Sequence, residues 1–223
     1  MKNKSHIINF KAGIFDLDGT ILNSMPVWDN LGADYLKSYN IEPPMNLREI
    51  LKPMSLAQAA EYFRKEFGIT ETSSEIVNQA NKMLEYAYFN TIEEKPGVYG
   101  FLENLKASDI KMCIATATDK YLVEAALKRL NLIGYFDFII TCKCVGAGKD
   151  SPVIYLEALK KLGTDIYETI IFEDSLHAIK TAKNAGFIVA GVYDPSAQED
   201  LEEIKKICDY FIEDFNLLSI DDF

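Results

Sequence analysis

The pattern of apolar and polar positions changes in character along the chain. From about residue 95 onward, short runs of β-branched and aromatic residues alternate with segments that carry apolar residues on one helical face. The runs predict strands, and one-sided helices between strands are typical of a parallel sheet covered on both faces. The predicted strands span 12–15, 112–116, 138–142, 169–172, 187–192 and 210–212.

Two of the predicted helices have clear end signals. The first begins at Ser151-Pro152, which suit the N-cap and first helical positions, and ends at Gly163. The second begins at Ser175 and stops at Gly186. Both helices place their apolar residues on one face, as expected for helices that pack on a sheet.

The stretch between the first two predicted strands is too long for a single crossover and carries its own helical pattern. Helices are predicted over 27–39, 55–67 and 74–90, with Pro and Gly between them. A structureless loop of that length is uncommon inside a compact domain. The sequence therefore predicts an inserted helical domain over 24–94, and a sheet domain made of 1–23 and 95–223.

Charge narrows the classes of partner. The chain of 223 residues has 34 acidic and 23 basic side chains, a formal net charge of -11. Such a field repels nucleic acid and anionic membrane surfaces, so a phosphorylated substrate must be attracted by local positive charge. The N-terminus has no signal-peptide pattern, no segment is apolar enough to span a bilayer, and the four cysteines suit buried thiols. We expect a cytoplasmic protein, monomeric or weakly dimeric, whose partner is a small molecule.

Reactive side chains follow several of the predicted strands. In open parallel sheets, ligands bind beyond the carboxyl ends of the strands, so these side chains are expected to meet in one crevice. Any one of them could be a turn former or a strand-end cap. Chance placement of the whole compatible set after separate strands is much less probable. The set consists of Asp16, Asp18, Thr116, Lys149, Glu173 and Asp174.

The carboxylates predict a cation. Two or three close carboxylates are costly unless a hard divalent ion neutralises them, and oxygen ligands suit Mg²⁺. Asp16 and Asp174 are the expected direct ligands, with Glu173 nearby.

The same residues suit phosphoryl transfer to a carboxylate. Asp16 is the expected nucleophile, which forms an aspartyl phosphate and divides one hard displacement into two easier steps. Asp18 is the expected general acid and base. Lys149 offsets negative charge, and Thr116 can donate a hydrogen bond to a phosphoryl oxygen.

At this point the chain resembles the haloacid dehalogenase superfamily over essentially its whole length. Four segments match the superfamily motifs in order: Phe15-Asp16-Leu17-Asp18-Gly19-Thr20, Ala115-Thr116-Ala117-Thr118, Gly148-Lys149-Asp150-Ser151-Pro152 and Phe172-Glu173-Asp174-Ser175. The insertion point is that of members with a helical cap. The resemblance implies a Rossmann-like core, a mobile cap, and Mg²⁺ held by Asp16, the Asp18 backbone carbonyl and Asp174. It also implies substrate binding by Thr116, Ala117 and Lys149.

Within the expected cap, Lys52 lies in a segment similar to a mutase loop whose lysine reaches the substrate. The alternative interpretation is that Lys52 is a solvent-exposed lysine at the end of a helix. Trp28 could line the mouth of the pocket or pack between cap helices. By alignment, Trp28 occupies the position of a cap histidine in β-phosphoglucomutases, and Leu56 that of an arginine which binds the distal phosphate. These departures favour a phosphatase, with a sugar phosphomutase as the alternative.

Three other classes fit less well. A two-component receiver domain has an acidic pocket but lacks the helical insertion and the second aspartate. A dehalogenase attacks carbon and needs neither Mg²⁺ nor a general acid at Asp18. A catalytically silent protein on the same fold would not need the complete set of motif residues.

Overall fold

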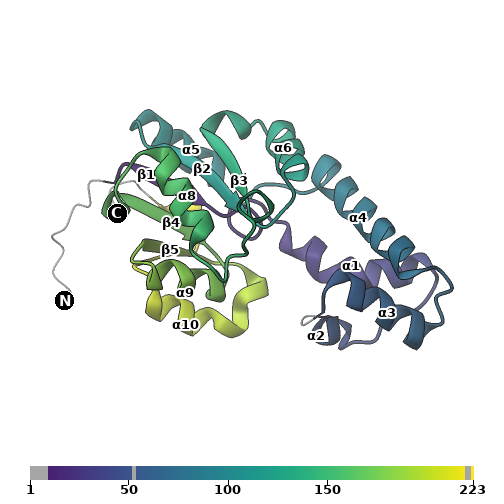
Figure 1. Ribbon diagram of the computed structural model, residues 1–223. Coiled ribbons are helices and arrows are strands. Elements are labelled where there is room, and N and C mark those ends of the chain that lie inside the picture. Colours follow the sequence, from purple (N-terminus) through teal and green to yellow (C-terminus); the bar gives the residue numbers. More distant parts are fainter. Residues whose placement is uncertain (1–9, 52–53, 219–221) are drawn as a thin grey trace. The chain divides into compact units, whose positions relative to one another are not determined.

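The computed structural model describes residues 10–51, 54–218 and 222–223 (Figure 1). The chain divides into two compact units, Met1–Asn23 with Glu93–Phe223, and Ser24–Ile92. We call the first the core unit and the second the helical unit. Where the chain leaves and re-enters the core unit, the Asn23 N–H donates to the Glu93 carbonyl at 2.9 Å. That the helical unit acts as a cap stays a prediction.

The core unit contains one six-stranded sheet, which confirms the predicted α/β class. Its strand order is β3-β2-β1-β4-β5-β6, and every neighbouring pair is parallel. This is the order of a Rossmann-like fold, with the first strand in the middle. The strands are β1 (Ala12–Phe15), β2 (Lys111–Thr116), β3 (Phe138–Thr141), β4 (Thr169–Glu173), β5 (Ile188–Val192) and β6 (Tyr210–Ile212).

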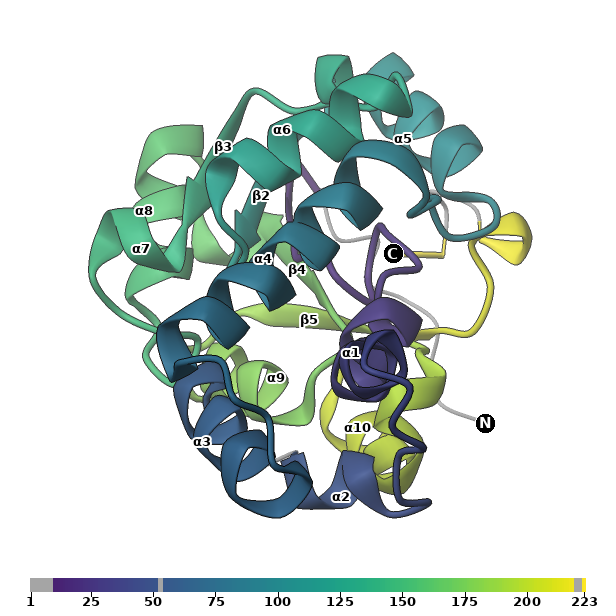
Figure 2. The same ribbon diagram turned by 90° about the vertical axis from the view of Figure 1, so that its right-hand side faces the viewer.

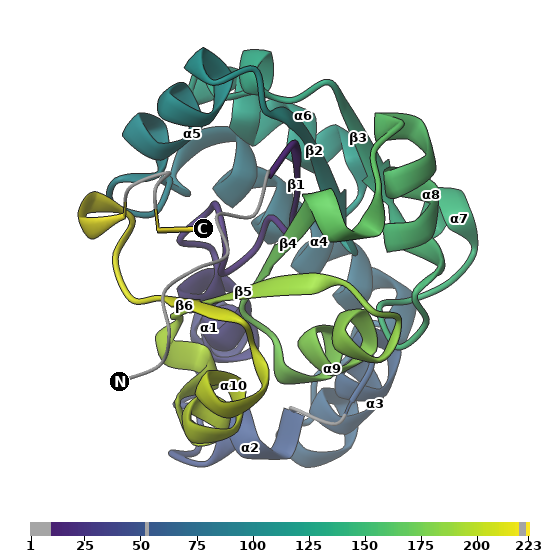
Figure 3. The same ribbon diagram turned by 90° about the vertical axis from the view of Figure 1, so that its left-hand side faces the viewer.

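Helices cover both faces of this sheet, as Figures 2 and 3 show. Crossovers between parallel strands are right-handed, so the crossovers into β2 and β3 share one face and those into β4 and β5 share the other. The first face carries α5 (Val98–Ala107) and α6 (Lys120–Arg129), and the second carries α8 (Val153–Leu162), α9 (Leu176–Asn184) and α10 (Leu201–Ile207). Short 3-10 turns complete the unit at Ile133–Tyr135, Ile166–Glu168, Pro195–Asp200 and Phe215–Leu217.

Successive side chains of a strand point to opposite faces of the sheet, so neighbouring residues pack into the two apolar layers on either side of it. Ile14 and Ile171 pack against the apolar faces of α8, α9 and α10. On the other face the rings of Phe15 and Phe172 stack with their centroids 4.2 Å apart, and Phe101 of α5 meets both rings edge-on. A Cβ on Gly13 would lie 2.5 Å from the Phe15 ring, so this aromatic packing requires glycine there.

Several predicted boundaries differ from the structure. The third strand stops at Thr141, because the Thr141 hydroxyl caps a short helix, α7 (Cys142–Val145). Helix α8 begins at Val153 with Pro152 at its N-cap, since the Ser151 N–H bonds to Gly148 in a preceding turn.

The expectation of buried cysteines holds only in part. All four cysteines are free thiols; Cys113 is buried, Cys142 and Cys208 are half-buried, and Cys144 is exposed. No helix in the described part of the chain combines the length and apolar character needed to cross a membrane.

The helical unit consists of α1 (Met25–Ser38), α2 (Leu47–Leu51), α3 (Leu56–Phe67) and α4 (Ser73–Asn90). Helices α3 and α4 begin with capping boxes, Ser55 with Gln58 and Thr72 with Glu75, which explains why their starts are readable from sequence. The short α2 was not predicted, because five residues are too few to display a helical period.

Candidate active site

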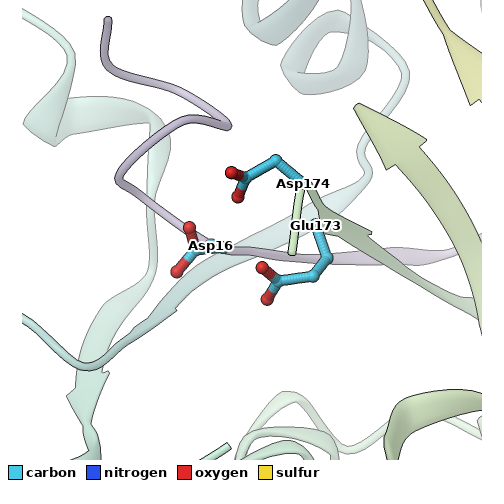
Figure 4. A group of neighbouring side chains, drawn as sticks. All are labelled: Asp16, Glu173 and Asp174. Carbon is cyan, nitrogen blue, oxygen red and sulfur yellow. The ribbon is translucent and has the colours of Figure 1, made fainter. Parts of the chain in front are cut away.

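Three carboxylates meet at the carboxyl edge of the sheet. Asp16 follows β1, and its N–H continues the ladder to Phe172 of β4 at 2.9 Å. Glu173 ends β4, and Asp174 comes next. All three are buried, and one oxygen of each lies within 4.8 Å of the others. Figure 4 shows the side chains directed toward one another.

Lys149 lies among these carboxylates although it belongs to a loop between α7 and α8. Its ammonium contacts Asp16 Oδ1 and lies 2.8 Å from Glu173 Oε2. Glu173 also accepts hydrogen bonds from the Tyr155 hydroxyl at 3.3 Å and the Ser175 N–H at 3.2 Å. Both oxygens of Glu173 therefore accept hydrogen bonds from the protein. Glu173, held by Tyr155 and Ser175, in turn holds the Lys149 ammonium beside Asp16.

A tight turn after Asp16 carries the second aspartate. The Leu22 N–H donates to Leu17 at 2.8 Å, and the Gly19 N–H donates to Leu22 at 3.0 Å. Gly19 has a φ of 81°, in the left-handed region that favours glycine. The Thr20 hydroxyl of this turn reaches Asp174 Oδ1 at 3.2 Å. The turn after β1 is thereby attached to the end of β4.

The segment after β2 supplies two threonines. Thr116 ends the strand and is 1% exposed. Its hydroxyl oxygen accepts the Thr118 N–H at 3.1 Å, and the Thr118 hydroxyl donates to Asp18 Oδ2 at 2.5 Å. The structure therefore joins Asp18 to the second motif.

Burial dominates the electrostatics. It raises the pKa of Asp16 from an ordinary value of 3.8 to about 7, although Lys149 acts in the opposite direction. Burial likewise raises the pKa of Asp174, and Glu173 and Asp16 raise it further. Burial alone would lower the pKa of Lys149, but the attraction of Asp16 and Glu173 outweighs it and raises that pKa. Lys149 therefore stays protonated. Its single positive charge does not offset the burial that raises the pKa values of Asp16 and Asp174.

This donor set fits a hard divalent cation. Asp16 and Asp174 present buried carboxylate oxygens at one point, where burial raises both pKa values and disfavours the charged forms. A bound cation would favour the charged forms and accept these oxygens as ligands. Glu173 is less suitable as a direct ligand because Lys149, Tyr155 and Ser175 occupy its oxygens.

Three further residues were predicted from the sequence to bind substrate. Ala117 is exposed in the bend between Thr116 and Thr118. Lys52 lies outside the described residues. Trp28 belongs to the helical unit, where its indole N–H donates to the Tyr88 hydroxyl at 3.0 Å and its side chain packs against the cluster of Leu31, Ala80 and Leu84. That contact favours packing within the helical unit.

Thr20, Thr118 and Tyr155 have no predicted role, yet each donates a hydrogen bond to a carboxylate of the site. The two threonines are part of the quoted motifs, so their hydroxyls were a usable signal. Tyr155 lies at an apolar-face position of α8, and that pattern indicates packing and not a hydrogen bond to the site.

A family model described as haloacid dehalogenase-like hydrolase matches residues 13–192. The chain belongs to this family.

Individual relatives are distant but cover most of the chain. A phosphorylated carbohydrates phosphatase of Thermotoga maritima is 27% identical over 79% of this chain and 82% of its own length. Hexitol phosphatase B of Escherichia coli is 25% identical over 85% of this chain and 86% of its own. A solved Thermotoga maritima structure, provisionally designated a β-phosphoglucomutase, has a TM-score of 0.80 and 25% identity, and covers 93% of this chain and 96% of that one.

Proposed function

We propose that this protein is a Mg²⁺-dependent phosphatase that hydrolyses a small phosphorylated metabolite, with a sugar or sugar-alcohol phosphate as the favoured substrate class. The observation that carries the proposal is the buried cluster of Asp16, Asp174 and Lys149 with Asp18 held beside it. Its similarity to phosphatases of phosphorylated carbohydrates and hexitols supports the substrate class.

In the first step, a carboxylate oxygen of Asp16 forms a bond to phosphorus while the bond from phosphorus to the ester oxygen breaks. Asp18 in its protonated form gives its proton to that departing oxygen, which leaves as an alcohol. The product on the protein is an aspartyl phosphate.

In the second step, water attacks phosphorus and Asp18, now a carboxylate, takes one proton from the water. The bond between phosphorus and the Asp16 oxygen breaks, which restores the Asp16 carboxylate and releases inorganic phosphate. Lys149 remains charged throughout and offsets the charge on the phosphoryl oxygens. Thr116 lies at the strand end where its hydroxyl can orient one of them.

Asp16 and Asp174 would hold Mg²⁺ through carboxylate oxygens, with the backbone carbonyl of Asp18 as a further ligand. The ion would supply charge neutralisation at the phosphoryl group and align it with Asp16.

A sugar phosphomutase is the second candidate, because the provisional β-phosphoglucomutase from Thermotoga maritima shares this fold. Two side chains of the helical unit disfavour it. Leu56 provides no charge for a distal phosphate, and the Trp28 N–H is already bonded to Tyr88.

The test is phosphate release from a panel of hexose phosphates, hexitol phosphates, glycerol phosphate and nucleotides, with Mg²⁺ or with excess EDTA. We expect the wild-type protein to release phosphate with Mg²⁺ and not with excess EDTA. The matched control, the Asp16→Asn variant, should release none in either condition. β-Glucose 1-phosphate with a catalytic amount of the 1,6-bisphosphate is assayed in parallel for glucose 6-phosphate. Full activity in EDTA would contradict the proposed site, and isomerisation with little phosphate release would establish the mutase.

A further inference from the structure

A short hydrogen bond joins two loops of the core unit at the candidate acid and base. The Thr118 hydroxyl donates to Oδ2 of Asp18 at 2.5 Å. Hydrogen bonds from a hydroxyl to an ionised carboxylate are typically this short and about twice as strong as neutral ones. Thr118 is only 8% exposed, so water has little access to the donor side of this bond.

The donor itself is held in place. The Thr118 N–H bonds to the Thr116 hydroxyl oxygen at 3.1 Å, which fixes the bend at the end of β2. The next residue, Asp119, is the N-cap of α6. Because threonine is branched at Cβ, its χ1 angle is also restricted. The hydroxyl therefore projects from a rigid part of the core unit.

We infer that Thr118 is a positioning residue that orients the Asp18 carboxyl group for proton transfer, an inference that rests on the proposed function. The terminal torsion of an aspartate is broad, so an unheld carboxyl group samples many directions. A general acid works only when its proton is within hydrogen-bond reach of the departing oxygen. Since Oδ2 accepts the Thr118 hydroxyl, Oδ1 carries the proton that Asp18 delivers.

The chain offers a matched pair of variants. Thr118→Val keeps the shape of the side chain and removes the hydroxyl, whereas Thr118→Ser keeps the hydroxyl and removes a methyl group. Each is compared with wild type in kcat/KM for two substrates with Mg²⁺ present. A hexose 6-phosphate has an alkoxide leaving group that needs a proton, while p-nitrophenyl phosphate releases a stabilised phenolate that does not.

Asp18 becomes a carboxylate as it gives up its proton, so the Thr118 hydrogen bond is made to a developing charge. We therefore expect Thr118→Val to lose roughly 10-fold to 100-fold in kcat/KM on the hexose 6-phosphate, the range for a hydrogen bond to a charged group. The loss on p-nitrophenyl phosphate should be under about 3-fold, and Thr118→Ser should recover most of the activity. In an Asp18→Asn background, Thr118→Val should add no further loss, because the two residues act through one proton transfer.

Equal losses on both substrates, equal losses in Val and Ser variants, or full additivity with Asp18→Asn would each overturn the inference. Wild-type protein without Mg²⁺-dependent hydrolysis would instead remove the proposed function, and the inference with it. An active wild type with an unaffected Thr118→Val variant refutes the role of Thr118 alone.

Discussion

Removal of one partner from the buried ion pair between Lys95 and Asp194 is expected to destabilise the core unit strongly. Their side chains are 10% and 1% exposed, and the ammonium lies 2.9 Å from Asp194 Oδ2. Asp194 Oδ1 accepts the Ser196 N–H at 2.9 Å. No hydrogen bond from the described residues reaches Oδ2, so Lys95 is its electrostatic partner.

The perturbation is Lys95→Met, which keeps most of the side-chain length and removes the charge. Removal of one partner leaves an uncompensated buried charge and costs about 3–5 kcal/mol. A cavity of about 260 Å³ borders the pair, so water can partly solvate the stranded carboxylate, and the lower end of the range applies. For a chain of this size, about 3 kcal/mol corresponds to a fall of roughly 6–12 °C in Tm.

The assay is thermal unfolding followed by circular dichroism in EDTA, so that metal binding makes no contribution. Lys11→Met is the matched control, because Lys11 forms an ion pair of similar length with Glu168, but the side chains are 50% and 32% exposed. Such a surface pair contributes at most about 1 kcal/mol. The double variant Lys95→Met with Asp194→Asn should recover part of the loss. A fall in Lys95→Met no larger than that in Lys11→Met would refute the reasoning.

Two further predictions concern the carboxylates. Asp16→Asn should be inactive and form no phosphoenzyme, whereas Asp18→Asn should be slowed by about 10²–10⁴-fold; rapid-quench phosphate labelling tests both, and the reverse order would contradict the roles. In EDTA, the free energy of unfolding should decrease as pH rises from about 4 to 7, because the pKa of Asp16 increases on folding and the folded state binds more protons in that window. Mg²⁺ at pH 8 should reverse that loss in urea titrations, and a flat pH profile without metal would count against it.

The sheet and its reactive edge could be predicted because both depend on local pattern. Apolar runs mark strands wherever both faces are buried, and all strands of a parallel sheet end at one edge. Once the strands at 12–15 and 169–172 are placed, Asp16 and Asp174 must lie near that edge.

The detailed contacts of the site could not be predicted, because they depend on register and loop geometry. Tyr155 reaches Glu173 only because α8 lies over the sheet with a particular rotation. The bend at Thr118 depends on a side-chain hydrogen bond two residues away. The partnership of Lys95 with Asp194 needs two loops distant in sequence, and nothing local in either loop indicates the other.

The charges of the buried side chains at the candidate site explain why a cation is expected there. Asp16, Glu173 and Asp174 with Lys149 carry three negative charges and one positive charge when fully ionised, so the buried cluster has a net charge of -2. A phosphate dianion would be repelled by that cluster and by the acidic chain as a whole. Protonation of Asp16 would relieve the repulsion but would also remove the nucleophile. A divalent cation would neutralise the cluster without consuming the Asp16 carboxylate, so under the proposed function we expect metal to bind before or together with substrate. We therefore expect the burial that raises the pKa of Asp16 to make the proposed activity depend on a metal.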